Sequence, residues 1–293
     1  MSKIRIGSRG SDLALWQANH VRKQLESLGH EVEIIIIKTQ GDKIQHLSFD
    51  KLEGKGFFTK EIEEALLNRS IDLAVHSHKD LETTPPENLT IACVSERENP
   101  SDLLLIRKEA VNSSEKWLLK ANAIVGTSSA RRKSQVLHYR PDSEIKDLRG
   151  NVPTRISKLR EGNYDAILLA KAGVDRLQLD LSEFEVVVLD PKEFVPAPAQ
   201  GVLGLQIREN DEELKSIMKQ LNHSDIAERI AIERGVLNKL EGGCQLPLGV
   251  YCDESQTIHV AYGTNSGVIY LHYKLSELNN PVGDIVSELT QHA

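Results

Sequence analysis

The chain has 293 residues with a formal net charge of −7, and 40% of its residues are hydrophobic and 27% charged. This length exceeds that of one typical domain, so we expect two or three domains. The acidic balance excludes general nucleic-acid binding, which needs a basic surface, and no apolar run is long enough to span a membrane. The N-terminal "MSKIRIGSRG" enters a strand-like pattern with no signal-peptide core, which predicts a cytoplasmic protein.

Strands and helices alternate through the first part of the chain. Hydrophobic patterns predict helices over 11–29, between Ser11 and Gly29, and over 58–68. The run over 31–39 is continuously apolar and rich in isoleucine, which is typical of a strand covered on both faces. Further strands are predicted over 71–77, 90–95 and 102–107.

The alternation then restarts and later changes. Strands are predicted over 123–127, 144–150, 165–170 and 185–190, with helices over 128–140 and 153–162. Such alternation implies parallel sheets flanked by helices, in two α/β domains. The breaks near 96–102 and at "FVPAPAQG" (194–201) suit a chain that passes twice between two lobes.

The last part of the chain has a different pattern. A long helix over 224–243 precedes three short strands, at 248–252, 257–263 and 268–275, and a final helix over 282–291. Consecutive strands with short turns form an antiparallel sheet, so this part is predicted to be a small α+β domain. The predicted domains are 1–98 with 198–218, then 99–197, then 219–293.

Two clusters of arginines stand out in a chain whose net charge is negative. In "VGTSSARRKSQ" a strand ends at Gly126, and Arg131 and Arg132 fall in the first turn of the next helix, where the helix dipole disfavours cations. An anion bound between them, at the helix start after Thr127, Ser128 and Ser129, would explain this placement. The alternative is a solvated surface pair.

The segment "LRGNVPTR" repeats the arrangement. Arg149 closes a strand, Gly150 and Asn151 permit a tight turn, and Arg155 lies near the start of the next helix. In parallel α/β sheets, ligands bind at the carboxyl ends of the strands. Arg9 and Ser11 lie at the corresponding end of the first predicted strand. Guanidinium groups that converge there imply a ligand with several carboxylates or phosphates.

Two further segments are candidates for chemistry. "AVHSHKDLETTPP" carries Asp80 just after a strand, either as a turn residue or as a carboxylate that stabilises a developing cation or handles a proton. Its two histidines are expected to pack or form hydrogen bonds. "LEGKGFFTKEI" lacks the Walker and Rossmann spacings and is expected to be a flexible loop, with a lid over the ligand-binding cleft as the alternative interpretation.

The three cysteines form no CxxC pair and no cluster with histidines, so we expect neither disulfides nor a metal site. Cys93 and Cys252 lie in strands and are expected to be small buried hydrophobes. Cys244 follows two glycines in "LEGGCQLPLG". A thiol on such a turn can act as a nucleophile or an attachment point.

These segments, in this order, closely resemble the porphobilinogen deaminase (hydroxymethylbilane synthase) family over nearly the whole chain. The matching segments are "SRGSDLALWQA", "GKGFFTKEIEEALL", "DLAVHSHKDL", "ERENPSD", "VGTSSARRKSQ", "LRGNVPTRISKL", "YDAILLAKAG", "PAPAQGVLGLQ" and "HSDIAERIAIERGVLNKLEGGCQLPLG". The resemblance implies two periplasmic-binding-protein-like α/β domains plus a small α+β domain with a three-stranded antiparallel sheet. It implies a transferase that joins four porphobilinogen molecules head to tail, releases ammonia at each step and hydrolyses off the linear tetrapyrrole.

The resemblance also implies roles for individual residues. A dipyrromethane cofactor would be bound through a thioether to Cys244, and Asp80 would be the catalytic acid. The implied cofactor contacts are Ser77, Lys79, Asp80, Thr127, Ser129, Arg131, Arg132, Arg149 and Gly150. The implied substrate contacts are Arg9, Ser11, Lys55, Arg149, Arg155 and Arg176. The implied partners are porphobilinogen and the growing oligopyrrole, with no metal, nucleic acid or membrane, and the protein is expected to be a monomer.

The chain departs from the family pattern at a few positions. His78 stands where methionine is usual, and "LETTPP" follows Asp80 where Val-Pro is usual. Ala199 replaces a usual glycine, and Gln206 a common acid. None of these positions carries an assigned chemical role.

Two other functions fit parts of the sequence. A two-lobed polycarboxylate-binding or sensor protein would use the same arginines, but would need neither Asp80 among them nor a third domain with an exposed cysteine. A cysteine-nucleophile transferase unrelated to pyrroles would need a histidine partner, and none is evident in sequence near Cys244.

Overall fold

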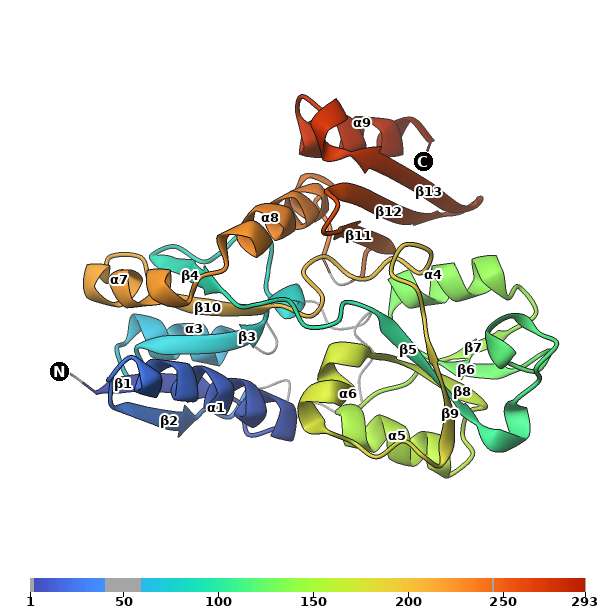
Figure 1. Ribbon diagram of the computed structural model, residues 1–293, viewed down its shortest axis with the longest axis horizontal. Coiled ribbons are helices and arrows are strands. Elements are labelled where there is room, and N and C mark those ends of the chain that lie inside the picture. Colours follow the sequence, from blue (N-terminus) through green and yellow to red (C-terminus); the bar gives the residue numbers. More distant parts are fainter. Residues whose placement is uncertain (1–2, 40–58, 244, 293) are drawn as a thin grey trace. The chain divides into compact units, whose positions relative to one another are not determined.

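The computed structural model describes residues 3–39, 59–243 and 245–292 (Figure 1). The chain forms two compact units: Met1–Glu98 with Gly201–Glu228, and Asn99–Gln200 with Arg229–Ala293. The division into three domains stays a prediction. Within the described residues, no helix is both long and apolar enough to cross a membrane.

The first unit is built on a five-stranded sheet. Its strands, in spatial order, are β2 (Val32–Ile36), β1 (Ile4–Ser8), β3 (Leu73–Ser77), β10 (Leu203–Arg208) and β4 (Leu89–Val94). β1 is parallel to β2 and β3, whereas β10 is antiparallel to β3 and β4. The sheet is therefore mixed, and the expectation of a parallel sheet is wrong because β10 had not been predicted.

Helices cover both faces of this sheet. α1 (Asp12–Ser27) and α7 (Glu212–Leu221) pack through Val21, Leu25 and Met218 on the face that carries Leu73 and Val75. α3 (Lys60–Leu67) packs on the opposite face with Ala74. The Ser11 side chain caps α1 by accepting from the Ala14 N–H at 3.4 Å, as the sequence pattern predicts.

One strand of this unit differs from its prediction. β2 is an edge strand with no buried residue, and Ile36 is 57% exposed. The continuous apolar run identified a strand correctly but wrongly implied cover on both faces. A run of isoleucines alone does not distinguish a central strand from an edge strand.

The second unit contains another mixed sheet. Its strands, in spatial order, are β7 (Glu144–Lys146), β6 (Ile124–Gly126), β8 (Ala166–Ala170), β5 (Asp102–Arg107) and β9 (Phe184–Val188). β6 is parallel to β7 and β8, but β5 is antiparallel to β8 and β9, which again corrects the expected parallel sheet. α4 (Ala130–Tyr139) packs on one face, and α5 (Val152–Arg160) and α6 (Lys171–Leu177) on the other.

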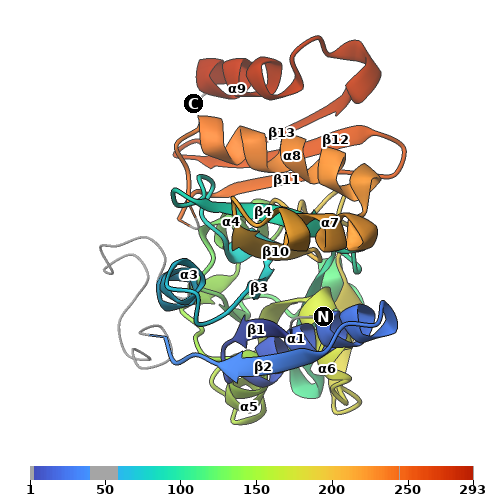
Figure 2. The ribbon, with the colours of Figure 1, turned by 90° about the vertical axis from the view of Figure 1, so that its left-hand side faces the viewer.

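The same unit holds the predicted antiparallel sheet of three strands. β11 (Leu248–Cys252), β12 (Thr257–Thr264) and β13 (Gly267–Lys274) lie side by side in that order. α8 (Ser224–Lys239) and α9 (Pro281–His292) pack against one apolar cluster of this sheet, and α8 lies across the strands in Figure 2. Short 3-10 turns occur at His78–Asp80 (η2), Lys108–Ala110 (η3), Lys116–Leu118 (η4) and Leu275–Glu277 (η5). Cys93 and Cys252 are buried side chains in β4 and β11, as predicted.

Candidate active site

The end of β3 leads directly into the turn that carries Asp80. Ser77 ends the strand, and His78, Lys79 and Asp80 form the 3-10 turn η2. Asp80 is exposed and Lys79 is partly buried. Because β1 and β3 are parallel neighbours, Arg9 and Ser11 follow a strand that ends at the same edge of the sheet. The geometry therefore brings the first-unit candidates to one sheet edge.

Ser77 is held by a residue that the sequence analysis missed. Gln17 of α1 is 3% exposed, and its Nε2 donates to Ser77 Oγ at 2.8 Å. Val75 lies on the same face of β3, against α1. A glutamine on the buried face of an amphipathic helix is the signal that could have identified it, since a buried polar group needs a partner.

The opposite face of β3 carries a second contact. His76 Nε2 lies 3.0 Å from Gln206 Oε1 of β10, and Gln206 Nε2 donates to Glu63 Oε1 of α3 at 3.1 Å. Burial lowers the pKa of His76 to about 4, so this imidazole is neutral at physiological pH. The prediction that His76 serves in hydrogen bonding is confirmed.

His78 is also accommodated by β10. A Cβ added to Gly204 would lie 3.0 Å from Cδ2 of the His78 ring, so the ring occupies the space that a side chain at residue 204 would need. The His78 N–H donates to the carbonyl of Val202 at 2.9 Å. His78 is buried at 8% exposure and packs, as predicted, in place of the usual methionine.

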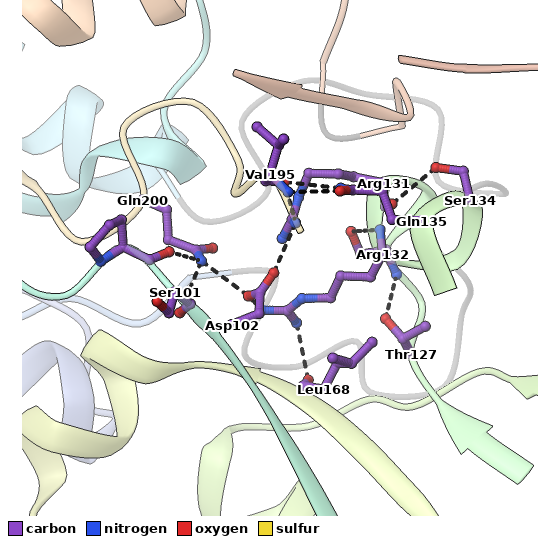
Figure 3. A network of polar contacts seen from close by, with 12 residues as sticks. Ser101, Asp102, Thr127, Arg131, Arg132, Ser134, Gln135, Leu168, Val195 and Gln200 are labelled. Carbon is purple, nitrogen blue, oxygen red and sulfur yellow. Dashed lines mark hydrogen bonds and ion pairs between the residues drawn. The ribbon is translucent and has the colours of Figure 1, made fainter. Parts of the chain in front are cut away.

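In the second unit, Arg131 and Arg132 share one buried carboxylate (Figure 3). Arg131 Nη1 lies 2.8 Å from Asp102 Oδ2, and Arg132 Nη2 donates to Asp102 Oδ1 at 2.6 Å. The arginines are 4% and 6% exposed, which rules out a solvated surface pair. The anion between them is Asp102 of the chain itself, so the bound ligand that their position at the helix start predicts stays a prediction.

This cluster has an excess of positive charge. Burial alone would raise the pKa of Asp102, but attraction to Arg131 and Arg132 outweighs burial and lowers that pKa well below its usual range. Two guanidinium groups thus face one carboxylate in a buried site. Among the described residues, buried Arg132 Nε has no hydrogen-bond acceptor. A buried cation with an unused donor fits an additional ligand carboxylate.

Further hydrogen bonds surround this cluster. Gln200 Nε2 donates to Asp102 Oδ1 at 3.0 Å, and Arg131 Nη1 donates to the carbonyl of Val195 at 2.9 Å. Gln135 of α4 bonds both the N–H and the carbonyl of Val195. The predicted second crossing between the lobes contains Val195 and Gln200. Both residues are thereby hydrogen-bonded to the arginine cluster or to Gln135 beside it (Figure 3).

The turn after β7 lies beside the turn after β6. Ser128 Oγ donates to the carbonyl of Leu148 at 3.1 Å and accepts from the Leu148 N–H at 3.0 Å. Thr127 and Ser129 belong to the first turn, and Ser129 caps α4 by accepting from the Arg132 N–H. These two hydrogen bonds hold the two arginine-bearing turns side by side, whereas a shared binding site for their arginines stays a prediction.

Gly150 has a conformation that needs glycine. Its φ is +112°, and an added Cβ would lie 2.6 Å from Thr154 Cγ2. Arg155 Nε donates to the Gly150 carbonyl at 2.8 Å, and Lys158 Nζ donates to the Arg149 carbonyl at 3.1 Å. Arg149 is partly exposed beside this turn. Arg176 is 8% exposed on α6, which follows β8, a parallel neighbour of β6.

Two candidates lie outside the described residues, namely Lys55 and Cys244. α8 ends at Lys239, so Cys244 follows a helix end as predicted. Its neighbours Gly243 and Gln245 are exposed, and within the described part of the chain nothing lies within 4 Å of a Cβ added to Gly243. Among the described ranges, no group of histidine, cysteine or acidic side chains could hold a metal ion.

Glu233 is another residue that the sequence analysis missed. It is fully buried on α8, and its Oε2 accepts from the Ala199 N–H at 2.7 Å while Oε1 accepts from the Cys252 N–H at 2.9 Å. Ala199 has a φ of +61°, a left-handed conformation that favours glycine. This backbone conformation explains why the family pattern has glycine at this position, since glycine has no Cβ and adopts a positive φ readily.

Comparisons with known proteins identify the family to which this architecture corresponds. The family model "Porphobilinogen deaminase, dipyromethane cofactor binding domain" matches residues 4–216, and "Porphobilinogen deaminase, C-terminal domain" matches residues 227–270. The porphobilinogen deaminase of Nitratiruptor sp. is 47% identical over 85% of this chain and 78% of its own length. That of Maridesulfovibrio salexigens is 47% identical over 86% of this chain and 80% of its own length. Among solved structures, the periplasmic VFT2 domain of Bordetella pertussis BvgS is similar at 12% identity and a TM-score of 0.45, covering 75% of this chain and 86% of that one.

Proposed function

This chain belongs to the porphobilinogen deaminase family, and we propose that it performs the family's reaction with Asp80 as the catalytic carboxylate. It is a porphobilinogen deaminase (hydroxymethylbilane synthase) of tetrapyrrole biosynthesis, which deaminates porphobilinogen and joins four molecules head to tail into hydroxymethylbilane. Its cofactor is dipyrromethane. The roles of individual residues, the attachment site and the oligomeric state are our proposals.

The position of Asp80 supports its proposed role. It is an exposed acid in a short turn, after a strand that Gln17 holds on one face and Gln206 on the other. Loss of ammonia from porphobilinogen leaves a cationic pyrrole, and a fixed carboxylate nearby lowers the free energy of that cation. Asp80 would accept from the pyrrole N–H and stabilise the charge, with Ser77 and Lys79 beside it.

The arginines are proposed to bind carboxylate arms. Arg131, Arg132 and Arg149, with Thr127, Ser129 and Gly150, would hold the cofactor, because the excess positive charge at Asp102 and the unused Arg132 Nε favour an added anion. When bound, the cofactor supplies the pyrrole carbon from which the chain grows. Arg9, Ser11, Lys55, Arg149, Arg155 and Arg176 would bind the acetate and propionate groups of incoming and growing pyrroles.

Cys244 is the proposed attachment point, through a thioether. The exposed glycine before it and the exposed glutamine after it support access of a ligand to this position. We further propose a cytoplasmic monomer that binds porphobilinogen and the growing oligopyrrole, and neither nucleic acid nor membranes. Light scattering of the purified protein tests the monomer, and a dimer mass would contradict it.

The role of Asp80 is tested by ammonia release from porphobilinogen. Asp80→Asn is expected to lower the rate by about 100-fold or more, because it removes the charge and keeps the shape. Glu87→Gln makes the same chemical change at an exposed position and should keep the wild-type rate. Wild-type release by Asp80→Asn would overturn the assignment.

A further inference from the structure

The amide of Gln206 lies between a buried histidine and a carboxylate. Gln206 is 1% exposed on β10, His76 is 7% exposed on β3, and Glu63 lies in the first turn of α3. The separations are 3.0 Å from Gln206 Oε1 to His76 Nε2 and 3.1 Å from Gln206 Nε2 to Glu63 Oε1. These two contacts link three elements on the α3 face of the sheet.

The chemistry of the three groups fixes the direction of each hydrogen bond. Burial raises the pKa of Glu63, and its Oε1 accepts from the Gln206 NH2 group. The Gln206 oxygen must then face His76, and an oxygen acceptor needs a donor. His76 is neutral and can donate from only one ring nitrogen, which is therefore Nε2. Glu63 thus sets the tautomer of a histidine that it does not contact.

His76 immediately precedes the segment that carries the proposed catalytic carboxylate. Ser77 follows it, then the turn His78–Asp80. The His78 N–H donates to the carbonyl of Val202, the residue before β10, and Gly204 of β10 leaves room for the His78 ring. Val202 and Gly204 therefore lie against His78, and Gln206 lies against His76, the residue farther from Asp80 in the chain.

We propose that Gln206 and Glu63 are positioning residues for the deaminase reaction, which hold His76 in one orientation and thereby fix the turn that carries Asp80. This inference depends on the proposed role of Asp80. Gln206 and Glu63 act through His76 and do not touch the substrate. Displacement of a catalytic group by about 1 Å can cost about 100-fold in rate, so a side chain that fixes the strand end influences turnover.

The test uses Glu63→Gln, with Glu64→Gln as its matched control on the exposed side of α3. Glutamine has the shape of glutamate but can donate as well as accept, so the Gln206 amide is no longer held in one direction. In Glu63→Gln we expect the NMR signal of the His76 Nε2–H proton to weaken, and kcat to fall about 3- to 10-fold with an unchanged KM. Glu64→Gln should keep the signal and the kcat of the wild type.

A second variant, Gln206→Leu, removes both hydrogen bonds and should abolish the Nε2–H signal and lower kcat further. If it fails to fold, the isosteric Glu63→Gln still decides. A wild-type Nε2–H signal in Glu63→Gln overturns the directional link. A changed signal with wild-type kcat overturns the positioning role. Asp80→Asn measured in parallel separates the two hypotheses, because full activity of that variant would contradict the role of Asp80 itself.

Discussion

Asp102 is the shared counter-ion of Arg131 and Arg132, and Arg132 Nη2 donates to its Oδ1 at 2.6 Å. Asp102 is the first residue of β5, which runs antiparallel to β8 and pairs Asp102 with Ala170. An antiparallel strand begins at the edge where its neighbour ends, so Asp102 lies at the same edge of the sheet as the arginine-bearing turns. The arginines are thus held in place before any ligand carboxylate arrives.

Removal of this counter-ion should destabilise the protein. In Asp102→Asn the buried net charge of the cluster rises from one to two positive charges, and loss of one member of a buried ion pair typically costs about 3–5 kcal/mol. The free energy of unfolding in urea measures the loss. Asp147→Asn, at an exposed position, is the control and should change it by less than about 0.5 kcal/mol. Equal stability of the two variants would contradict the buried-charge account.

Restoring the usual glycine at residue 199 should stabilise the chain. Ala199 has a φ of +61°, and the left-handed region costs a residue with a Cβ roughly 1 kcal/mol. We expect Ala199→Gly to raise the unfolding free energy by up to about 1 kcal/mol. Ala197→Gly, nearby and without a positive φ, should lower it by about 0.5–1 kcal/mol. If both variants lost stability equally, strain at Ala199 would be refuted.

His76 makes the stability depend on pH in a defined direction. Its pKa is lowered by burial from 6.5 to about 4, so below pH 6.5 the unfolded chain takes up a proton that the folded chain does not. This lowers stability as pH falls from about 6.5 to 4, by up to about 3 kcal/mol. His76→Gln should flatten urea stability over this range, whereas His138→Gln, at an exposed position, should not. An unchanged slope in His76→Gln would argue against a neutral buried imidazole.

Arg149 should matter for cofactor loading. Arg149→Leu removes a guanidinium beside the Gly150 turn, so we expect less protein-bound cofactor, measured by colour with acidic aldehyde reagent, and at least 10-fold lower activity, since a charged hydrogen bond contributes about 1.5–3 kcal/mol. Lys133→Leu on exposed α4 surface is the control. Full occupancy and activity in Arg149→Leu would remove the main support for a carboxylate-binding cluster.

Much of the architecture could be predicted from the sequence because it depends on local patterns. Ser11 caps a helix, strands and helices alternate, and the last sheet is a meander. The strand over 203–208 was missed because a central antiparallel strand that returns from a distant crossing has no local signal. The orientation of β5 was missed for the same reason. Asp102 begins β5 at the sheet edge that carries the arginine-bearing turns, and Gln206 lies within β10 beside β3, so both contacts depend on these antiparallel pairings.

The candidate site could be predicted only in part. Arginines at strand ends predicted an anion-binding edge, since parallel strands bring their carboxyl ends together. Four buried polar residues are distant in sequence from the groups they contact, namely Gln17, Asp102, Gln200 and Glu233. A polar residue on a predicted buried face, such as Gln17, indicates that a partner is needed, but it does not indicate which residue that partner is. Long-range hydrogen bonds of buried polar groups become visible only in the folded chain.

The central claim is that Cys244 carries a covalently bound primer from which the oligopyrrole grows. The most direct measurement is the intact mass of the purified protein, compared with that of Cys244→Ser. The account predicts that the wild-type mass exceeds the sequence mass by two linked pyrrole units and that the variant shows no such excess. A wild-type mass equal to the sequence mass, unchanged after incubation with porphobilinogen, would contradict it.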